Sequence, residues 1–488
     1  MKKHFCSIEN FKNWADSKSG DPGNLYSDIL DRICELDKKV KAFGHLDSAD
    51  ILKDKAKDSA KKGFLTDVPI GIKDNICIKG RKTTCASRIL EGFRPPYNAH
   101  VIDKLLDEGT FLINGANMDE FAFGSSCETS VYGPTKNPWD FDRIPGGSSG
   151  GAVAAVASSE VIAALGSDTG GSIRQPAAMC GVVGFKPTYG RVSRFGLIAF
   201  ASSLDQIGPI TRNVSDCARM LEVISGYDNK DSTSVNIDVP NYTESLFSEI
   251  KGMRIGVPAE YMLPEIDPGV KKRINEAIDV FKDLGAEIVE ISLPHTKYAV
   301  SCYYIIAPAE ASSNLARYDG VHYGHRSEQA KDLIEMYIKS RNEGFGKEAK
   351  RRILLGTYAL SSGYYEAYYL KAQKVRTKIS RDFKEAFKLC DCILTPTSPS
   401  TAFKIGDRID DPIQMYLSDI FTIPANLAGL PAVSIPCGLV DNLPVGMQLM
   451  AAPFKEEDLI KCAHAFESNT EHHKICASDV NSSLETAD

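Results

Sequence analysis

Short apolar segments with strand character alternate with helical segments along this chain, and this order restricts the fold more than any other feature. Apolar runs bounded by Gly or Pro predict buried strands, and apolar residues at helical spacing predict helices. Strands are expected at Val68–Lys73, Phe111–Gly115, Arg254–Pro258, Ile288–Leu293, Cys392–Pro396 and Ala432–Pro436. Helices are expected at Tyr26–Lys39, Ala49–Lys61, His100–Glu108, Pro268–Leu284 and Tyr369–Leu389. The β-α-β order predicts an α/β fold, a central mixed sheet with helices on both faces.

Two helix starts carry capping residues. Asp267 precedes Pro268, a residue that suits the first helical position, and is expected to cap that helix. Ser215 is expected to cap a helix that ends near Gly226.

No linker divides the 488 residues and no internal repeat is visible, so one large domain is expected over residues 1–476. The polar residues 477–488 are expected to form a disordered tail.

Charge and hydropathy restrict the partners. The net charge is −7 and no cluster of basic residues occurs, so any RNA is expected to be held mainly by another subunit. The first residues lack the apolar core of a signal peptide, and Gly151–Leu165 is too short to span a bilayer. Thirteen scattered cysteines without a CxxC pair indicate reduced thiols in the cytosol and no metal site.

Glycine is concentrated in two neighbouring segments, Pro145–Gly151 and Gly166–Arg174. Such loops leave several backbone N–H groups pointing one way, which suits phosphate binding or acyl transfer. The P-loop lysine and the G-x-G-x-x-G turn are both missing, which disfavours phosphate. Ser172 supplies a hydroxyl beside small-residue amides, as serine acyl transfer requires, although Gly-Gly-Ser also occurs in ordinary turns.

Residues 146–150 also match the G-x-S-x-G elbow of α/β-hydrolases at Ser148. That elbow needs a strand directly before the serine, and the segment Arg143–Pro145 is a poor strand. It also needs a downstream histidine, and none of the six candidates has suggestive neighbours. They are His295, His322, His325, His464, His472 and His473.

Lys73 ends an apolar strand and is the candidate base. Burial disfavours an ammonium ion, and a neutral amine is a competent general base near pH 7. The alternative is an edge-strand lysine that points into solvent.

Lys73 in GIKDN, Ser148 in PGGSSGG and Ser172 in SDTGGSIRQPA resemble the amidase signature family, as does the long segment Gly184–Arg212. The resemblance implies a Ser-cis-Ser-Lys triad, with a cis peptide bond before Ser148. Ser172 is then the nucleophile, Ser148 relays its proton to neutral Lys73, and the oxyanion hole consists of backbone amides. Those amides belong to Thr169, Gly170, Gly171 and Ser172.

Three later stretches resemble the glutaminase branch of this family, and the resemblance covers residues 5–470. They are Tyr303–Asp319, Arg351–Leu360 and Ser418–Gly429. Glutamine is a zwitterion, so its pocket needs a cation and an anion, which Arg352 and Asp419 supply. The resemblance places Tyr303 in the same pocket. The plainer alternatives are that Arg352 is a surface arginine and that Asp419 caps a helix or turn.

The resemblance divides the domain into a helical segment (1–60), a catalytic core (61–230) and a pocket portion (231–476). It also implies partners in a heterotrimeric amidotransferase. Ammonia passes to a companion B subunit, which uses ATP and Mg to activate Glu-tRNA(Gln), and in some systems Asp-tRNA(Asn). A small C subunit holds the two together, and this chain carries no cofactor. Two rivals are a stand-alone amidase acting on other amides and a non-catalytic assembly protein.

Overall fold

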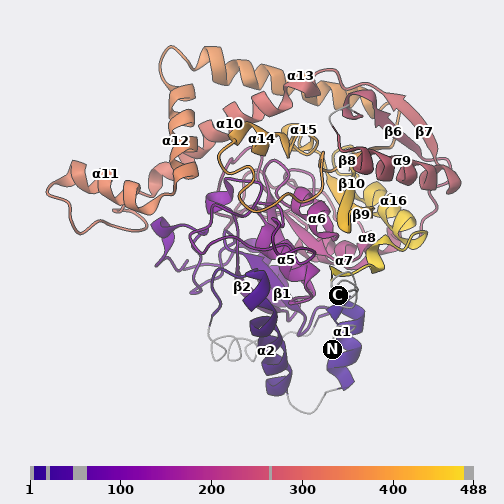
Figure 1. The fold of residues 1–488 in the computed structure, drawn as a ribbon, viewed down its shortest axis with the longest axis horizontal. Helices are drawn as coiled ribbons and strands as arrows, with labels where there is room; N and C mark the ends of the chain where they lie inside the picture. The colour runs from indigo at the N-terminus through magenta and orange to yellow at the C-terminus, as the bar shows by residue number, and fades with distance from the viewer. Residues whose placement is uncertain (1–4, 18–21, 48–62, 263–265, 478–488) are drawn as a thin grey trace.

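Ten strands form one sheet at the centre of the molecule (Figure 1), in a computed structural model that describes residues 5–17, 22–47, 63–262 and 266–477. The strand order is β2-β1-β3-β5-β4-β9-β10-β8-β6-β7. In chain order the first five are β1 (Pro69–Lys73), β2 (Phe111–Ala116), β3 (Ala163–Asp168), β4 (Val183–Lys186) and β5 (Gln206–Thr211). The others are β6 (Arg254–Pro258), β7 (Glu287–Ile291), β8 (Cys392–Pro396), β9 (Ala432–Val440) and β10 (Leu443–Ala451).

The sheet is mixed. Strands at both of its ends pair in parallel (β1 with β2 and β3, β6 with β7 and β8), whereas the pairs between β3 and β8 are antiparallel. The central strands β3, β5 and β4 come from the first half of the chain, and their neighbours β9 and β10 come from its end. One sheet therefore joins distant parts of the sequence, which confirms the expected α/β fold.

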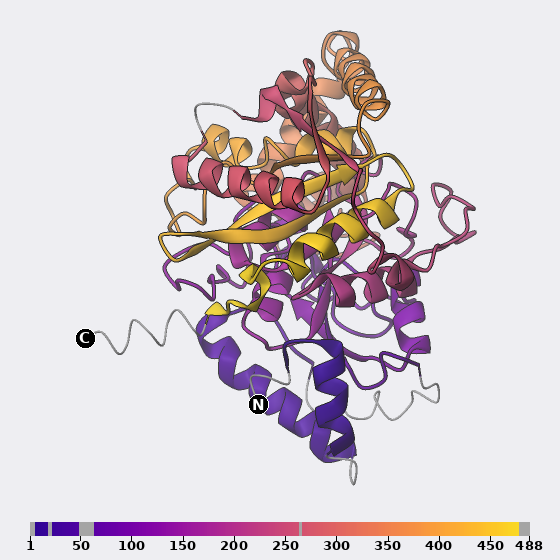
Figure 2. The same ribbon diagram turned by 90° about the vertical axis from the view of Figure 1, so that its right-hand side faces the viewer.

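Helices cover both faces of the sheet (Figure 2). On one face lie α5 (Gly150–Ala157) and α6 (Arg174–Cys180), which pack against each other and against the central strands. On the other lie α7 (Val214–Ile224), α9 (Pro268–Asp283) and α16 (Glu456–Ser468). Among the described residues before 250, the remaining α-helices are α1 (Ile8–Ser17), α2 (Pro22–Val40), α4 (His100–Asp107) and α8 (Tyr242–Ser245).

A helical layer projects beyond the sheet and carries part of the candidate site (Figure 1). Its central helix, α10, packs against α12, α13 and α15. The layer consists of α10 (Ala299–Asn314), α11 (Leu333–Gly344), α12 (Lys347–Leu360), α13 (Lys371–Ala386), α14 (Pro412–Leu417) and α15 (Ile423–Leu427).

The six expected strands are all present, with ends shifted by a few residues in most cases. Asp267 caps α9 as predicted, since its side chain accepts from the Gly269 and Val270 amides. The prediction for Ser215 was wrong. Helix α7 begins at Val214, and Asn213 caps it by accepting from the Asp216 amide at 2.7 Å.

The expected helix over 369–389 is observed as α13, preceded by a π-helical turn at Glu366–Leu370. The expected helix Ala49–Lys61 and the tail lie outside the described residues. None of the helices in the described ranges is both long and apolar enough to cross a membrane.

Candidate active site

The register of two parallel strands brings the catalytic candidates together. Ile72 of β1 lies opposite Leu165 of β3, so both strands end at the same edge of the sheet. β1 ends at Lys73, and β3 leads directly into the glycine-rich loop Thr169–Ser172. Helix α6 follows that loop, and the second glycine-rich segment leads into α5 beside it.

The Lys73 amine is completely buried and surrounded by hydroxyl groups. Its Nζ lies 2.7 Å from Ser148 Oγ, 2.9 Å from Ser149 Oγ and 2.9 Å from Ser167 Oγ. Burial lowers the pKa of Lys73 to about 8, although the charge of nearby Asp119 opposes that shift. Lys73 is therefore not an edge lysine in solvent, and its amine is neutral in a substantial fraction near pH 8.

Ser148 directly follows a cis peptide bond between Gly147 and Ser148. Ser172 lies beside this segment, because its carbonyl accepts from the Ser149 amide at 3.1 Å. The Ser172 side chain is 8% exposed, so a ligand can reach it. Within the part of the chain that the structure describes, its hydroxyl makes no hydrogen bond.

The shape of the loop depends on both of its glycines. A Cβ at Gly170 would lie 2.8 Å from the Tyr303 phenol, so that ring packs directly on the loop. Gly171 has φ +139°, and a Cβ there would lie 2.1 Å from Thr422 Oγ1. Any side chain at either position would displace the loop.

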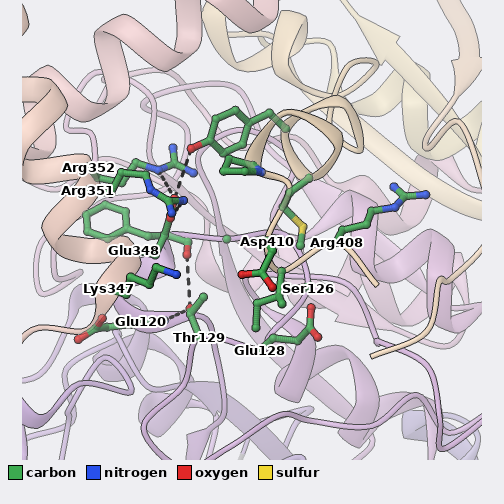
Figure 3. A pocket seen from close by; sticks show the side chains of 16 residues that line it. Glu120, Ser126, Glu128, Thr129, Lys347, Glu348, Arg351, Arg352, Arg408 and Asp410 are labelled. Atoms are coloured by element: carbon green, nitrogen blue, oxygen red, sulfur yellow. Dashed lines mark hydrogen bonds and ion pairs between the residues drawn. The ribbon is translucent and has the colours of Figure 1, made fainter. Parts of the chain in front are cut away.

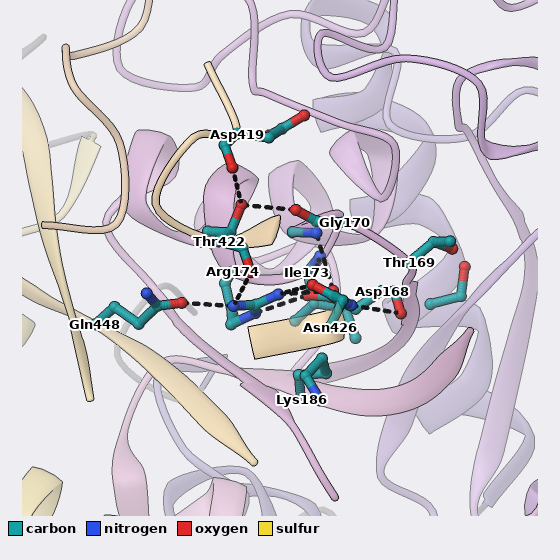
Figure 4. A network of polar contacts seen from close by, with 12 residues as sticks. Asp168, Thr169, Gly170, Ile173, Arg174, Lys186, Asp419, Thr422, Asn426 and Gln448 are labelled. Atoms are coloured by element: carbon teal, nitrogen blue, oxygen red, sulfur yellow. Dashed lines mark hydrogen bonds and ion pairs between the residues drawn. The ribbon is translucent and has the colours of Figure 1, made fainter. Parts of the chain in front are cut away.

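A buried ion pair holds the start of α6 beneath this loop (Figure 4). Arg174 donates to both oxygens of Asp168, at 3.0 and 2.9 Å. It also donates to Asn426 and Gln448 from the end of the chain. Although burial alone would raise it, Arg174 holds the pKa of Asp168 at about 2, so the pair stays charged.

Asp168 also uses one of the expected oxyanion donors. The Gly171 amide donates to Asp168 Oδ1 at 3.0 Å and is therefore engaged in this structure. The Gly170 and Ser172 amides make no hydrogen bond to the described residues and remain available to a ligand.

Arg352 lines a pocket of about 310 Å³ and is only 3% exposed (Figure 3). Glu348 accepts from its Nε at 2.7 Å, and the guanidinium carbon lies 4.6 and 4.7 Å from the ring centres of Tyr304 and Tyr416. Arg352 is thus a buried cation fixed in place by Glu348 and two tyrosine rings, and it is not a surface arginine. Because Glu348 takes the Nε side, the two terminal nitrogens can meet a carboxylate.

Asp419 is also buried. Ser125 Oγ donates to its Oδ2, while Oδ1 has no hydrogen-bond partner among the described residues. Burial raises the pKa of the Asp419 carboxyl to about 8, and the Ser125 hydrogen bond opposes that shift. Asp419 precedes Thr422 by one turn, and the Thr422 hydroxyl donates to the Gly170 carbonyl at 2.7 Å (Figure 4). A free acceptor therefore lies close to the glycine-rich loop.

Comparison with known proteins agrees with this arrangement. A model of the amidase family matches residues 24–460. The chain belongs to the amidase family. It is 59% identical to the A subunit of the glutamyl-tRNA(Gln) amidotransferase of Thermodesulfovibrio yellowstonii, over 93% of this chain and 95% of the relative.

Solved amidase structures share the fold. That of the glutamyl-tRNA(Gln) amidotransferase A subunit from Thermotoga maritima has a TM-score of 0.78 and 49% identity, and covers 91% of each chain. The peptide amidase from Stenotrophomonas maltophilia has a TM-score of 0.80 at 28% identity, and covers 95% of this chain and 97% of the other. The amidase fold is thus shared with enzymes named for different amides.

The α/β-hydrolase alternative finds no support in this amidase. Arg143–Pro145 is not a strand. Among the described residues no histidine hydrogen-bonds to Ser148, Ser149 or Ser172. The described residues also contain no group of three or more His, Cys, Asp or Glu arranged to hold a metal.

Sequence reasoning missed several residues that build the site. Ser149, Ser167, Ser125, Gln175 and Thr422 contact the candidates directly. Ser149, Ser167 and Gln175 stand inside the glycine-rich motifs, which was an available signal. Ser125 lies in a loop that no local pattern connects to the site, whereas Thr422 lies inside Ser418–Gly429, one of the stretches that carry the family resemblance.

Proposed function

We propose that this chain is the A subunit of a glutamyl-tRNA(Gln) amidotransferase, and that it hydrolyses glutamine to glutamate and ammonia. The observation that carries the choice of substrate is the buried Asp419, one of whose oxygens has no partner among the described residues, close to the glycine-rich loop. Buried Arg352, which lines the pocket of Figure 3, supplies a cation. A zwitterionic α-amino acid supplies the complementary ammonium and carboxylate groups. An apolar amide would leave Asp419 Oδ1 without a hydrogen-bond partner and the terminal nitrogens of Arg352 without a carboxylate.

In the proposed reaction, Ser172 Oγ attacks the side-chain amide carbon of glutamine. Its proton passes to Ser148, whose own hydroxyl proton passes to neutral Lys73 Nζ across the 2.7 Å contact. The carbonyl π-electron pair moves onto oxygen, and the Gly170 and Ser172 amides stabilise that oxyanion. The Gly171 amide contributes only if it leaves Asp168.

The same path then runs in reverse. The proton held by Lys73 returns through Ser148 to the amide nitrogen, the C–N bond breaks, and ammonia leaves a glutamyl ester on Ser172. Water attacks the ester carbonyl and gives a proton to the same relay. The bond between the acyl carbon and Ser172 Oγ then breaks, the relay returns the proton to Ser172 Oγ, and glutamate is released. Tyr303 supports this chemistry by packing on Gly170.

The proposal extends to partners. Ammonia passes to a B subunit that uses ATP and Mg to activate Glu-tRNA(Gln), and a small C subunit joins the two in the cytosol. The net charge of −7 suits a chain that does not itself hold the tRNA. Asp-tRNA(Asn) is a second substrate to assay.

The test is glutamine-dependent amidation of Glu-tRNA(Gln) by the full chain copurified with the B and C subunits. We expect glutamine hydrolysis and an acyl-enzyme adduct on Ser172. Cleavage of an aryl or fatty amide with no response to glutamine would establish the stand-alone amidase instead. A complex that amidates with added ammonium but forms no adduct on Ser172 would establish the non-catalytic assembly protein.

A further inference from the structure

Gln175 is a completely buried residue at the start of α6, three positions after Ser172. Its backbone N–H donates to the Gly171 carbonyl at 2.8 Å, which fixes it to the glycine-rich loop. The mechanism described above gives its side chain no role.

The Gln175 amide bridges two loops. Its Oε1 accepts from the Gly147 amide at 3.0 Å, and its Nε2 donates to the Ser125 carbonyl at 2.9 Å. One partner is only a donor and the other only an acceptor, so the orientation of the amide is determined. The contact on the Gly147 side is close, because a Cβ at Gly146 would lie 2.5 Å from Gln175 Oε1.

Each end of this bridge reaches a functional group. Gly147 forms the peptide bond to Ser148, which contacts Lys73. Ser125 donates its hydroxyl to Asp419. Hydrogen bonds, joined through the covalent bonds of Ser125 and Gly147, therefore connect the carboxylate proposed to bind the substrate ammonium to the peptide that carries the relay serine.

We infer that Gln175 is a positioning residue that couples binding of the substrate α-ammonium at Asp419 to the placement of Ser148, so that the ammonium promotes turnover as well as affinity. This rests on the proposed function. An ammonium ion on Asp419 orders Ser125, and Gln175 transmits that order to Gly147. A substrate amide without the ammonium does not order Asp419 and Ser125, so Gln175 transmits no such order to Gly147.

The first experiment exchanges the amide for a carboxyl group. In Gln175→Glu, a protonated carboxyl group reproduces both hydrogen bonds, whereas the ionised form sets a carboxylate oxygen against the Ser125 carbonyl. We expect the ratio of kcat, variant over wild type, to fall about tenfold or more from about pH 6 to about pH 9. Taking the ratio at each pH removes the part of the pH profile that the variant shares with wild type. A ratio that does not change with pH would overturn the inference.

The second experiment changes the substrate. Glutaramate is glutamine without its α-ammonium group, and ammonia release from both is measured with the reconstituted amidotransferase. For wild type we expect kcat for glutamine to exceed that for glutaramate by about tenfold or more. Gln175→Met, which removes both hydrogen bonds, should bring the two kcat values to within about a factor of three. Equal fractional losses with the two substrates would show a merely structural role and contradict us.

Gln206 offers a matched control. It is also completely buried, and its amide joins the Gly190 N–H to the Val192 carbonyl, away from Ser125 and Asp419. Gln206→Glu and Gln206→Met should reduce kcat by the same factor for glutamine and glutaramate. A selective loss for glutamine in these controls would mean that any buried bridge has the effect, which overturns the specific role of Gln175.

If the Gln175 variants do not fold, Ser125→Ala tests the coupling between Asp419 and Ser148 instead. It leaves both Gln175 hydrogen bonds in place and breaks only the link to Asp419. We expect the kcat advantage of glutamine to shrink in this variant, and an unchanged advantage would refute the path. If the wild-type complex does not hydrolyse glutamine at all, the proposed function fails instead, so the two failures are distinct.

Discussion

The Thr422 hydroxyl donates to the Gly170 carbonyl at 2.7 Å, across 252 residues of sequence. The same side chain fills the space that a Cβ on Gly171 would occupy. Thr422 follows the turn that carries Asp419, so this contact helps to set the distance between the proposed ammonium-binding group and the glycine-rich loop.

The first prediction concerns this contact. Thr422→Val keeps the shape but leaves the buried Gly170 carbonyl without the hydroxyl, at a cost of about 1–3 kcal/mol. We expect kcat for glutamine to fall about tenfold or more if the loss falls on the transition state. Thr422→Ser, which keeps the hydroxyl, should stay within a few-fold of wild type. A fully active Thr422→Val enzyme would show that the contact does not shape the loop.

The triad is tested by its non-additivity. Ser172→Ala should abolish glutamine hydrolysis, and Lys73→Ala or Ser148→Ala should each reduce kcat by a factor of about 1000 or more. Since the three residues act as one proton-transfer unit, adding Lys73→Ala to Ser172→Ala should cost almost nothing more. If Ser172→Ala turns over well while Ser148→Ala is inactive, Ser148 is the nucleophile.

The Lys73 base predicts a pH profile. The neutral amine is the active form and its pKa is lowered to about 8, so activity should rise as pH increases toward 8 and then level off. Well below pH 8, kcat should fall about tenfold for each pH unit, and kcat/KM should fall faster because Asp419 must also ionise before glutamine binds. Lys73→Arg stays protonated at every accessible pH and should be inactive. An active Lys73→Arg enzyme would remove Lys73 from the role of base.

Asp419 predicts proton release on glutamine binding. Its pKa of about 8 means that the free carboxyl is mostly protonated at pH 7, whereas the ammonium of glutamine requires the ionised form. Calorimetry of Ser172→Ala in buffers of different ionisation enthalpy should detect about one proton released per glutamine at pH 7, and less above pH 8. The double variant with Asp419→Asn should release none. Equal release from both proteins would point to another group.

Glutamine hydrolysis and amidation of Glu-tRNA(Gln) should be separable by a change of nitrogen source. In the complex, Ser172→Ala should lose glutamine-dependent amidation of Glu-tRNA(Gln) yet keep amidation driven by added ammonium. Arg352→Ala should behave similarly, mainly by raising KM, at about 2–5 kcal/mol. Asp419→Ala should raise KM by a similar amount and also lower kcat, because Asp419 is proposed to bind the ammonium that promotes turnover. Arg351→Ala, whose guanidinium is more exposed, should cost much less. Failure of ammonium to restore amidation to an intact Ser172→Ala complex would contradict this division of labour.

The sequence predicted the parts of the fold whose patterns are local. Strands such as Cys392–Pro396 are short apolar runs, and Asp267 is a strong helix cap. Strands β3 and β5 were not predicted because they are made of small residues or contain Gly and Pro, yet the packed sheet buries every position. Ser215 was expected to cap α7, but the helix begins two residues earlier than that cap requires, and Asn213, an equally suitable capping residue, caps it.

The residues of the candidate site also fall into those that a local pattern predicts and those that it does not. Lys73, Ser148 and Ser172 each lie in a short motif that marks them as candidates, so the sequence alone predicts that they belong to one site. The support around them comes from residues far along the chain. Thr422, Asn426 and Gln448 meet the loop only because β9 and β10 join the central strands, and no local pattern encodes that contact.

The Arg174 ion pair depends on residues that the ribosome adds near the end of synthesis. Arg174 is completely buried, and its guanidinium is satisfied by Asp168 together with Asn426, Gln448 and the Thr422 carbonyl. A growing chain that has emerged only as far as Cys180, the end of α6, lacks three of these four partners, and an arginine charge is costly to bury with incomplete pairing. The pairing of Arg174 is therefore complete only after Gln448 has left the ribosomal exit tunnel. The loop that carries Ser172 acquires its full support when synthesis of the chain is nearly finished.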